Sequence, residues 1–524
     1  MIRRKEEWKE RYGKGRSRDC CGGGGEVNST DSQRRAPLSD DAIADLSLLD
    51  LSRMIRNRQI TSRRLVEIYL DRIERYDGRD GINSFITVMA DHALRAAEEA
   101  DRLTRRGHFQ GILHGLPLAI KDNIETKGIR TTGGSKILAS WVPSRDAHVV
   151  RKLKRAGAII LGKTNMHEFA LGATNDNPHY GPARNPFDLS RIPGGSSGGS
   201  GAATAAALCG ASLGTDTGGS VRIPASLCGV VGLKPTLGRV GRGGVIPLSF
   251  SRDCVGPITR TVVDAAMILE VIAGRDPQDR ASSSRAVPRY PDLLRRDLVG
   301  KRFGLPRRFI AERIDQDTQK VLDESVRHIE GLGGIIEEID IAHIDLAPGA
   351  DSNVVRPEAV YLIEAYLKRI DPQATIGAYL DLMGADVRSI LGGQTGIPGS
   401  KPVLGHEYVK TLREDCEKMR AGFREAMSGV DGLLFPTTPF PACKINEDPG
   451  VDRDGRKNTF MTYVRNCVPL SVVGYPAISV PAGYSKTGLP IGLEIVTRPW
   501  EEEKLLSMAC AFEQSTKVRK PPSL

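Results

Sequence analysis

The sequence predicts an α/β fold, because short apolar segments alternate with longer segments of helical periodicity along most of the chain. Residues 116–121 form a nearly continuous apolar run that ends in Lys121, as expected for a strand buried on both faces. A helical pattern at residues 148–155 and a second apolar segment at residues 158–161 follow. The same alternation returns between residues 301 and 339. The simplest organisation is one large α/β domain.

The remaining elements follow in chain order. Helices are expected first at residues 46–58 and 61–75, where Thr61 or Ser62 can cap the second helix. Strands are expected at residues 85–88, 116–121, 158–161, 301–305, 335–339, 432–435, 477–480 and 491–496. Further helices are expected at residues 91–105, 148–155, 165–171, 202–208, 262–273, 316–332 and from residue 501. Residues 356–427 have a mostly helical pattern, so a helical insertion is placed at about residues 350–428.

Composition argues against several classes of protein. No run approaches the roughly 18 apolar residues of a membrane span, so no membrane association is expected. The nine cysteines form no C-x-x-C pair, which argues against a disulfide framework or a zinc site and favours a reducing, cytoplasmic location. The net charge of +10 is mild for 524 residues, and aromatic residues make up only 5%. A nucleic-acid-binding chain would show a basic stripe with interleaved aromatics, so no nucleic-acid partner is expected.

The first 36 residues differ from the rest of the chain. Residues 1–18 are dense in Lys, Arg and Glu, and residues 22–25 are a glycine tract. Such a segment cannot bury enough apolar surface to offset the entropy lost on ordering it. We therefore expect a disordered basic tail at residues 1–36 and the folded domain at residues 37–524.

A glycine- and serine-rich stretch at residues 191–222 is the most informative part of the sequence. Its first half, residues 194–200, reads Gly-Gly-Ser-Ser-Gly-Gly-Ser. This run could cradle a phosphate at a helix N-terminus, form the nucleophile elbow of a hydrolase, or be a flexible loop. It lacks the G-K-[ST] ending of a phosphate loop. No apolar strand leads into it, and no downstream histidine lies in a recognisable catalytic context, so the elbow match is treated as accidental.

The second half of the stretch places a serine behind two glycines. It reads Gly-Thr-Asp-Thr-Gly-Gly-Ser-Val-Arg from residue 214 to residue 222. Backbone amides in such a turn can converge on a developing oxyanion, and glycine permits the tight turn. The expected oxyanion donors are the amides of Thr217, Gly218, Gly219 and Ser220. Asp216 and Arg222 flank the loop and can pin it by a charge-assisted hydrogen bond, which is a structural role.

Lys121 ends the expected strand at residues 116–121. A lysine in that position is partly desolvated, which lowers its pKa and lets the neutral amine accept a proton. The alternative is that the side chain reaches solvent or pairs with the adjacent Asp122. The residue by itself does not decide between these two roles.

Taken together, these motifs resemble the amidase signature family. The family pattern G-G-S-S-G-G-S, followed by G-T-D-x-G-G-S-[IV]-R-x-P, is present with Pro224 in place, and residues 119–123 match the family's lysine motif. The three motifs occur in the family's order and at its spacing, and the resemblance extends from about residue 46 to the last helix. It implies a single domain with a mixed central sheet covered by helices on both faces and a catalytic core at about residues 110–275.

The resemblance also implies a mechanism. Ser220 would attack the amide carbonyl and form an acyl-ester, while Ser196, which follows a cis peptide bond in the family, would relay the proton to neutral Lys121. Ser197 would support Lys121 by a hydrogen bond. Neither a metal nor an organic cofactor is expected.

The substrate is predicted from a narrower likeness. Residues 172–177, 227–232 and 459–466 resemble the indoleacetamide and mandelamide hydrolase branch, which cleaves primary amides of small aryl-substituted acids. This likeness implies that the protein hydrolyses such carboxamides, with a small-molecule amide as partner and a homodimer among the assemblies it allows. The acyl pocket is then expected around the insertion at residues 356–391 and the residues Ala170, Gly172, Asn175 and Tyr463.

Three other functions are kept open. Residues 162–169 resemble the amidase subunit of a glutamine-dependent tRNA amidotransferase, although the charged groups that its glutamine site needs are not identified in the second half of the sequence. Hydrolysis of N-substituted amides or anilides with an esterase side activity is a second alternative. The third is a catalytically silent scaffold protein, which the complete Ser-Ser-Lys set argues against.

Overall fold

The central feature of the molecule is one mixed sheet. The computed structural model describes residues 38–395 and 401–524, so the expected tail at residues 1–36 lies outside the described residues. Within Asp40–Leu524, which forms one unit, eleven strands are hydrogen-bonded side by side. Their order across the sheet is β1 (Phe85–Val88), β3 (Ile159–Thr164), β2 (Pro117–Lys121), β4 (Ala211–Asp216), β6 (Cys254–Thr259), β5 (Val231–Lys234), β10 (Ala477–Tyr484), β11 (Pro490–Val496), β9 (Gly432–Pro436), β7 (Arg302–Pro306) and β8 (Ile335–Ile339).

The sheet consists of two parallel groups joined by antiparallel pairs. Strand β2 is parallel to β3 and β4, and β7 is parallel to β8 and β9. Strands β6, β5, β10 and β11 connect the two groups by antiparallel pairing. The pairing of β2 with β4 brings the end of the lysine strand beside the strand that leads into the loop of Ser220.

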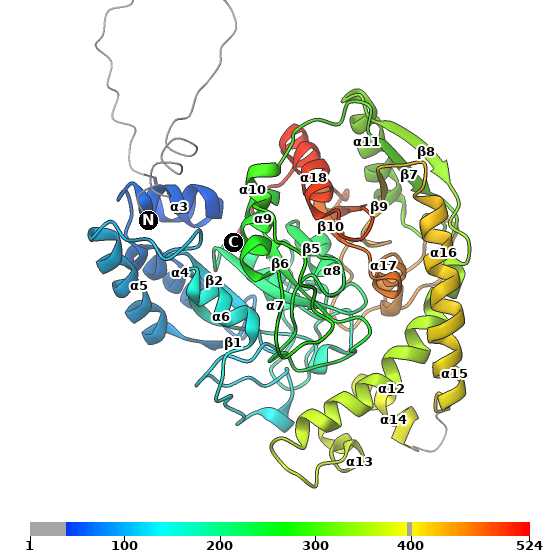
Figure 1. Ribbon diagram of the computed structural model, residues 1–524, viewed down its shortest axis with the longest axis horizontal. Helices are drawn as coiled ribbons and strands as arrows, with labels where there is room; N and C mark the ends of the chain where they lie inside the picture. Colours follow the sequence, from blue (N-terminus) through cyan, green and yellow to red (C-terminus); the bar gives the residue numbers. More distant parts are fainter. Residues whose placement is uncertain (1–37, 396–400) are drawn as a thin grey trace, which may run out of the picture. The chain divides into compact units, whose positions relative to one another are not determined.

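Helices cover both faces of the sheet (Figure 1). The second expected helix is confirmed as α4 (Ser62–Tyr76), with Thr61 as its N-cap accepting the Arg64 N–H. In the centre, α7 packs with α8, whereas α9 packs with α10 and α18. The helices outside the insertion are α2 (Asp40–Ala44), α3 (Leu48–Arg56), α4, α5 (Ala90–Arg105), α6 (His148–Arg155), α7 (Gly198–Ala205), α8 (Arg222–Leu227), α9 (Val262–Ile272), α10 (Tyr290–Leu293), α11 (Gln316–Gly331), α17 (Val468–Val473) and α18 (Glu502–Thr516).

A group of helices lies between β8 and β9 in the chain (Figure 1). These helices are α12 (Ala347–Leu367), α13 (Ile376–Tyr379), α14 (Ala385–Thr395), α15 (Gly405–Lys410) and α16 (Cys416–Ala426). The longest of them, α12, packs against α14 and against α17 of the main body. The mostly helical pattern of residues 356–427 is therefore borne out among the described residues.

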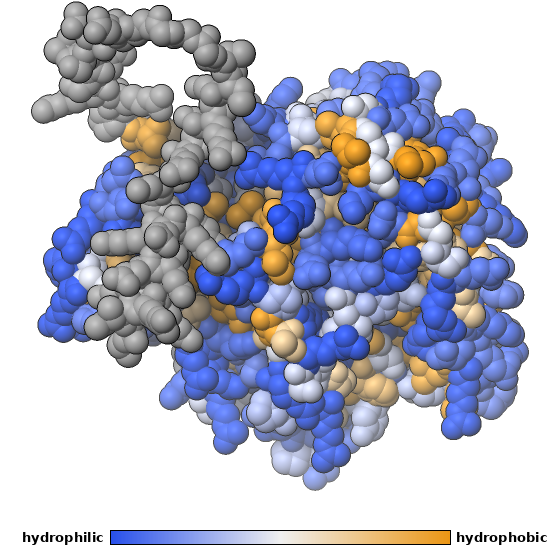
Figure 2. Space-filling view, turned by 45° about the horizontal axis from the view of Figure 1, so that its top comes forward, coloured by the Kyte–Doolittle hydropathy of each residue, from blue (hydrophilic) through white to orange (hydrophobic). Residues whose placement is uncertain are grey.

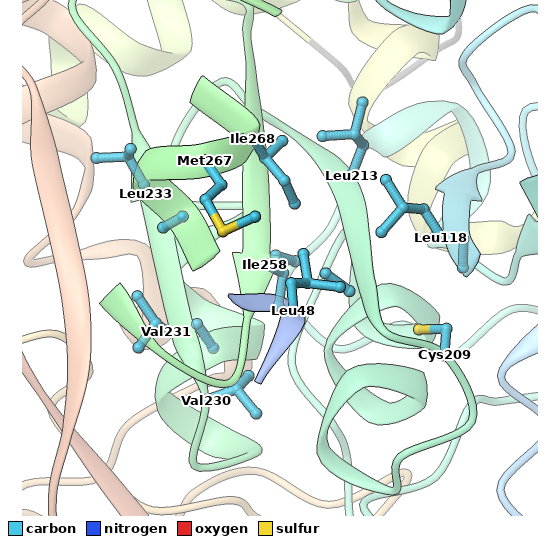
Figure 3. Close-up of a cluster of buried hydrophobic side chains, with 14 of the residues drawn as sticks. Leu48, Leu118, Cys209, Leu213, Val230, Val231, Leu233, Ile258, Met267 and Ile268 are labelled. Carbon is cyan, nitrogen blue, oxygen red and sulfur yellow. The ribbon is translucent and has the colours of Figure 1, made fainter. Parts of the chain in front are cut away.

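The largest apolar core lies around the central strands. Figure 3 shows Leu118 from β2, Leu213 from β4 and Ile258 from β6 beside Met267 and Ile268 from α9. All five side chains are buried, so burial of apolar surface holds these strands and α9 together. The face seen in Figure 2 is mainly hydrophilic where it is not drawn grey, with apolar residues in small separate groups. In the part of the chain that the structure describes, no helix is long and apolar enough to cross a membrane.

The structure corrects two expectations about the elements. Residues 165–171 contain only one 3-10 turn, Glu168–Ala170, because Phe169 and Ala170 have φ values of 48° and 63°, which end any helix. The strands β4, β5 and β6, which lie at the centre of the sheet, were not expected at all. Their sequences are rich in small and polar residues, and a stretch such as Ala211–Asp216 carries little strand signal of its own.

Candidate active site

Lys121 occupies the end of β2 and is completely buried. Its Nζ donates to Ser196 Oγ at 2.8 Å and to Thr215 Oγ1 at 2.9 Å. Burial lowers the pKa of Lys121 to about 7, although Asp216 and Asp253 act in the opposite direction. The adjacent Asp122 lies 3.3 Å from Lys163 Nζ, and this second buried lysine is its ion-pair partner. Lys121 therefore directs its amine to hydroxyl groups, and the amine is readily neutral near pH 7.

Ser196 and Ser197 lie between β3 and β4 at the start of α7. The Gly195–Ser196 peptide bond is cis. Ser197 was expected to hydrogen-bond Lys121, but its Oγ instead bonds the backbone carbonyl and amide of Thr215, at 3.2 and 3.3 Å. Thr215 supplies the hydroxyl next to Lys121 because β4 runs beside β2, a neighbourhood set by sheet pairing. The Ser197 N–H donates to the Ser220 carbonyl, so the two serine segments are in direct contact.

The loop that carries Ser220 is held by a buried ion pair. Arg222 Nε and Nη2 donate to the two oxygens of Asp216, at 3.0 and 2.9 Å. The same carboxylate accepts the N–H groups of Gly219 and Val221. Arg222 Nη1 also reaches Glu494 Oε1 at 2.5 Å. Asp216 and Arg222 therefore hold the loop by two hydrogen bonds, as expected. The same carboxylate also accepts backbone N–H groups of the turn.

This contact changes the expected set of oxyanion donors. The Gly219 N–H points to Asp216 at 2.9 Å and is already used as a donor there. Thr217, Gly218 and Ser220 line the cavity described next, so their amides remain the candidate donors. Gly219 has φ +127°, and a Cβ at this position would lie 2.6 Å from Cys467 Cβ. Glycine is needed there for the shape of the turn.

Ser220 opens onto a cavity of about 380 Å³. Of the residues expected to bind substrate, Ala170 and Gly172 line it. Asn175 does not: it is buried, and its Oδ1 accepts the Gly198 N–H at 3.0 Å. Tyr463 does not either, because it is completely buried with its hydroxyl donating to Pro441 O at 2.6 Å. The cavity is lined instead by its neighbours Met461, Thr462, Val464 and Arg465.

Four charged residues of the second half of the chain also line this cavity. They are Arg313, Asp351, Arg356 and Arg465. Asp351 pairs with Arg252 at 2.6 Å, and Arg313 and Arg465 have acidic neighbours of their own, Asp452 and Glu312, each at 3.6 Å. Sequence reasoning missed these residues because they come from separate loops and helices without a shared motif. It missed Thr215 although that residue lies inside the recognised Gly-Thr-Asp motif.

A buried lysine paired with one serine, beside a second serine at a cavity, is an arrangement suited to amide hydrolysis. The fold and this set of groups define the protein as an amide hydrolase. The family comparison agrees, because residues 64–506 match the Amidase family. The chain belongs to this family, the amidase signature family that its motifs resemble, and is an amidase.

Individual relatives give a narrower picture. The chain is 39% identical over 496 residues to the A subunit of the glutamyl-tRNA(Gln) amidotransferase of Moorella thermoacetica, covering 91% of this chain and 98% of that protein. Among solved structures, the native peptide amidase of Stenotrophomonas maltophilia has a TM-score of 0.80 at 32% identity, covering 91% of this chain and 98% of that one. The Thermotoga maritima structure of the glutamyl-tRNA(Gln) amidotransferase A subunit has a TM-score of 0.73 at 32% identity, covering 90% and 95%.

These comparisons overturn two expectations. The prediction of a hydrolase for small aryl-substituted carboxamides is wrong, because curated relatives at 39% and 41% identity are amidotransferase A subunits. That prediction depended on the short segments at residues 172–177, 227–232 and 459–466. The expectation of a small-molecule partner without nucleic acid is contradicted as well, because those relatives belong to an enzyme named for a tRNA.

Proposed function

We propose that this protein is the A subunit of a glutamine-dependent tRNA amidotransferase. In this role it hydrolyses the side-chain amide of glutamine, and the ammonia is used by partner subunits on a glutamate-charged tRNA. The observation that carries the proposal is the 39% identity to an amidotransferase A subunit over 98% of that protein's length. Because the partner subunits act on a tRNA, the complex must work in the compartment that holds tRNA. The cytoplasmic location expected from the cysteines is therefore part of the same proposal.

The charges in the cavity support glutamine as the substrate. Glutamine carries a carboxylate and an ammonium group on its α-carbon, at the end of the molecule opposite the side-chain amide. Arg313, Arg356 and Arg465 can attract the carboxylate, and Asp351 can accept from the ammonium. These are charged groups in the second half of the chain, of the kind that a glutamine site requires. They lie in the same cavity as Ser220, so an amino-acid amide can bind there with its amide at the serine.

The catalytic steps are assigned to residues as follows. Neutral Lys121 accepts the Ser196 proton while Ser196 takes the proton of Ser220, and Ser220 Oγ attacks the amide carbon. The amides of Thr217, Gly218 and Ser220 are proposed to stabilise the oxyanion. The proton returns through Ser196 to the leaving nitrogen, which departs as ammonia and leaves a glutamyl ester on Ser220. Water then hydrolyses the ester and releases glutamate.

Coexpression with candidate partner subunits tests the proposal. We expect glutamine hydrolysis, followed by ammonia release, to rise strongly when the chain is purified with the other amidotransferase subunits from its own source. The complex should also convert glutamate-charged tRNA to glutamine-charged tRNA with glutamine as nitrogen donor. The matched control is a complex carrying Ser220→Ala. The proposal would be refuted if the chain alone turned over neutral amides as fast as the complex does and the complex hydrolysed no glutamine.

A further inference from the structure

His167 lies between the catalytic serines and the helical insertion. Its backbone N–H donates to the Ser196 carbonyl at 3.1 Å. Its ring Nδ1 accepts the Asn175 N–H at 3.2 Å, and its Nε2 is 2.5 Å from Asp386 Oδ2 in α14. The side chain is only 2% exposed. No step of the proposed mechanism uses this histidine.

The contacts of the ring fix its tautomer. Nδ1 faces a backbone N–H and must act as an acceptor, so the proton lies on Nε2, which donates to the Asp386 carboxylate. Both nitrogens are thereby engaged in directional contacts. The ring is therefore in hydrogen-bond contact with both Asp386 and the Asn175 backbone.

Asn175 extends the contact to the far side of the serine pair. Its Oδ1 accepts the Gly198 N–H at 3.0 Å, at the first residue of α7. The backbone of His167 therefore holds Ser196, and its ring, through Asn175, holds the residue after Ser197. The segment with the two serines is thus hydrogen-bonded on both sides to groups that a single histidine positions.

The other end of this network belongs to the wall of the cavity. Asp386 lies on α14, whose Ile390 lines the cavity, and α14 packs against α12, which supplies Asp351 and Arg356. The neighbouring Glu168 accepts the Gly384 N–H at 2.7 Å and adds a second tie. The ring also lies directly behind the cavity wall, since a Cβ on Gly172 would lie 2.2 Å from His167 Cε1.

We propose that His167 is a positioning residue that couples the helical insertion to the Ser196 relay through Asp386 on one side and Asn175 on the other. When substrate seats the insertion, the Asp386 contact orients the ring, and the ring sets the position of the serine segment. The coupling concerns the relay and does not depend on which amide is bound.

Two amide variants separate the two sides of the ring. In His167→Asn the amide oxygen can take the place of Nδ1 and keep the Asn175 contact, but the side chain is too short to reach Asp386. In His167→Gln the amide nitrogen can take the place of Nε2 and keep the Asp386 contact, but the Asn175 contact is lost. Asp386→Ala removes the second partner, whereas Asp386→Asn can still accept from the ring.

The readout is the rate at which a sulfonyl fluoride modifies Ser220 in the full chain, followed by intact mass. This reaction needs the relay but no glutamine, so its result is independent of the substrate assignment. We expect His167→Asn, His167→Gln and Asp386→Ala each to slow the rate about tenfold. Asp386→Asn should stay within about twofold of wild type. The double variant His167→Asn with Asp386→Ala should react no more slowly than either single variant, because both substitutions remove the same contact, the one between His167 and Asp386.

Other results would overturn the coupling. Wild-type rates for His167→Asn and Asp386→Ala would show that the insertion does not act through the ring, even if His167→Gln were slow. Losses that multiply in the double variant would show two independent effects. Rates are compared per folded protein, measured by thermal unfolding, so that a variant that only loses stability keeps its rate and counts against the proposal. Asp381→Asn, an exposed acid of the same insertion with a 96% exposed side chain, is the control and should leave the rate unchanged.

Discussion

At the scale of single residues, the proposed mechanism depends on a lysine that gives up its charge. The Nζ of Lys121 donates to two hydroxyls, those of Ser196 and Thr215. Hydroxyls compensate a buried ammonium less well than an anion does, so desolvation dominates and lowers the pKa of Lys121. Burial also lowers the pKa of the equally buried Lys163, and there Asp122 at 3.3 Å acts in the opposite direction. The two lysines share the effect of burial and differ in the partners that their amines contact.

This environment predicts the pH dependence of the reaction. Below the folded-state pKa of Lys121, about 7, the amine is protonated and cannot accept the Ser196 proton. The value of kcat/KM for amide hydrolysis should therefore rise with pH, about tenfold per unit below pH 7, and level off above it. A profile measured from pH 5 to 9 checks this. An activity that is flat down to pH 5 would contradict the role of Lys121, and Lys121→Met should have no measurable turnover.

Thr215 provides a second test at this scale. Its hydroxyl accepts from both Lys121 Nζ and Asn123 Nδ2, so Thr215→Val removes an acceptor without a large change in shape. The loss should leave the amine free to move from Ser196 and lower kcat about tenfold, with KM little changed. Steady-state kinetics give both values. Thr104→Val is the matched control, since that buried hydroxyl bonds His114 and lies in α5. An equal loss in the control would contradict a specific role.

At the scale of elements, the turn between β4 and α8 is a unit built on one ion pair. Arg222 is completely buried and contacts both Asp216 and Glu494. Removal of Arg222 leaves two buried carboxylates without their cation. The free energy of unfolding therefore falls by more than the ion pair itself contributes to it. The turn that carries Ser220 and strand β11, which carries Glu494, are thus stabilised together.

Arg222→Met tests this unit. We expect the free energy of unfolding to fall by about 3–5 kcal/mol, because a buried ion pair is broken from one side. Denaturant unfolding followed by circular dichroism measures the change. Arg242→Met, which breaks a pair with Asp279 nearer the surface, should cost clearly less. Equal costs would mean that the buried network contributes nothing special.

The sequence predicted the outer elements better than the centre. The strands at residues 85–88 and 335–339 and the helices at residues 148–155 and 316–332 match the structure within a residue. In the two helices the apolar residues recur at helical spacing. Strands β4, β5 and β6 were not predicted, because their small and polar residues carry little strand signal. These residues are buried by neighbouring strands and helices, and tertiary packing alone makes them strands. In the site, the motifs placed Lys121, Ser196 and Ser220. The partners of those residues depend on sheet pairing, which no local pattern encodes.

At the scale of the whole molecule, the cavity combines two distant parts of the chain. Ser220 and Gly218 come from the centre of the sheet, whereas Asp351 and Arg356 come from α12 in the insertion. In the proposed function, chemistry and recognition are therefore supplied by different segments. A change in the cavity-lining residues of α12 should alter which amide binds without altering how it is cleaved.

Arg356→Gln tests this division. If Arg356 attracts the carboxylate of glutamine, its loss should raise KM for glutamine about tenfold or more and leave kcat close to wild type. KM for butanamide, which lacks the carboxylate, should not change. Initial rates of ammonia release with the two amides decide the matter. Arg388→Gln, an arginine of α14 paired with the exposed Asp381, serves as the control. A parallel rise of KM for both amides would contradict the assignment.

The place where the insertion leaves and rejoins the sheet has an evolutionary consequence. Strands β8 and β9 both flank β7, so the connecting segment begins and ends on strands whose axes lie about 10 Å apart in a fixed frame. A connection anchored in this way can be lengthened, shortened or replaced at small entropic cost. New substrates are thus accessible by exchanging the cavity-lining part of this connection while Asp386 and the serine relay are kept, and grafted connections would be a direct route to enzymes of altered selectivity.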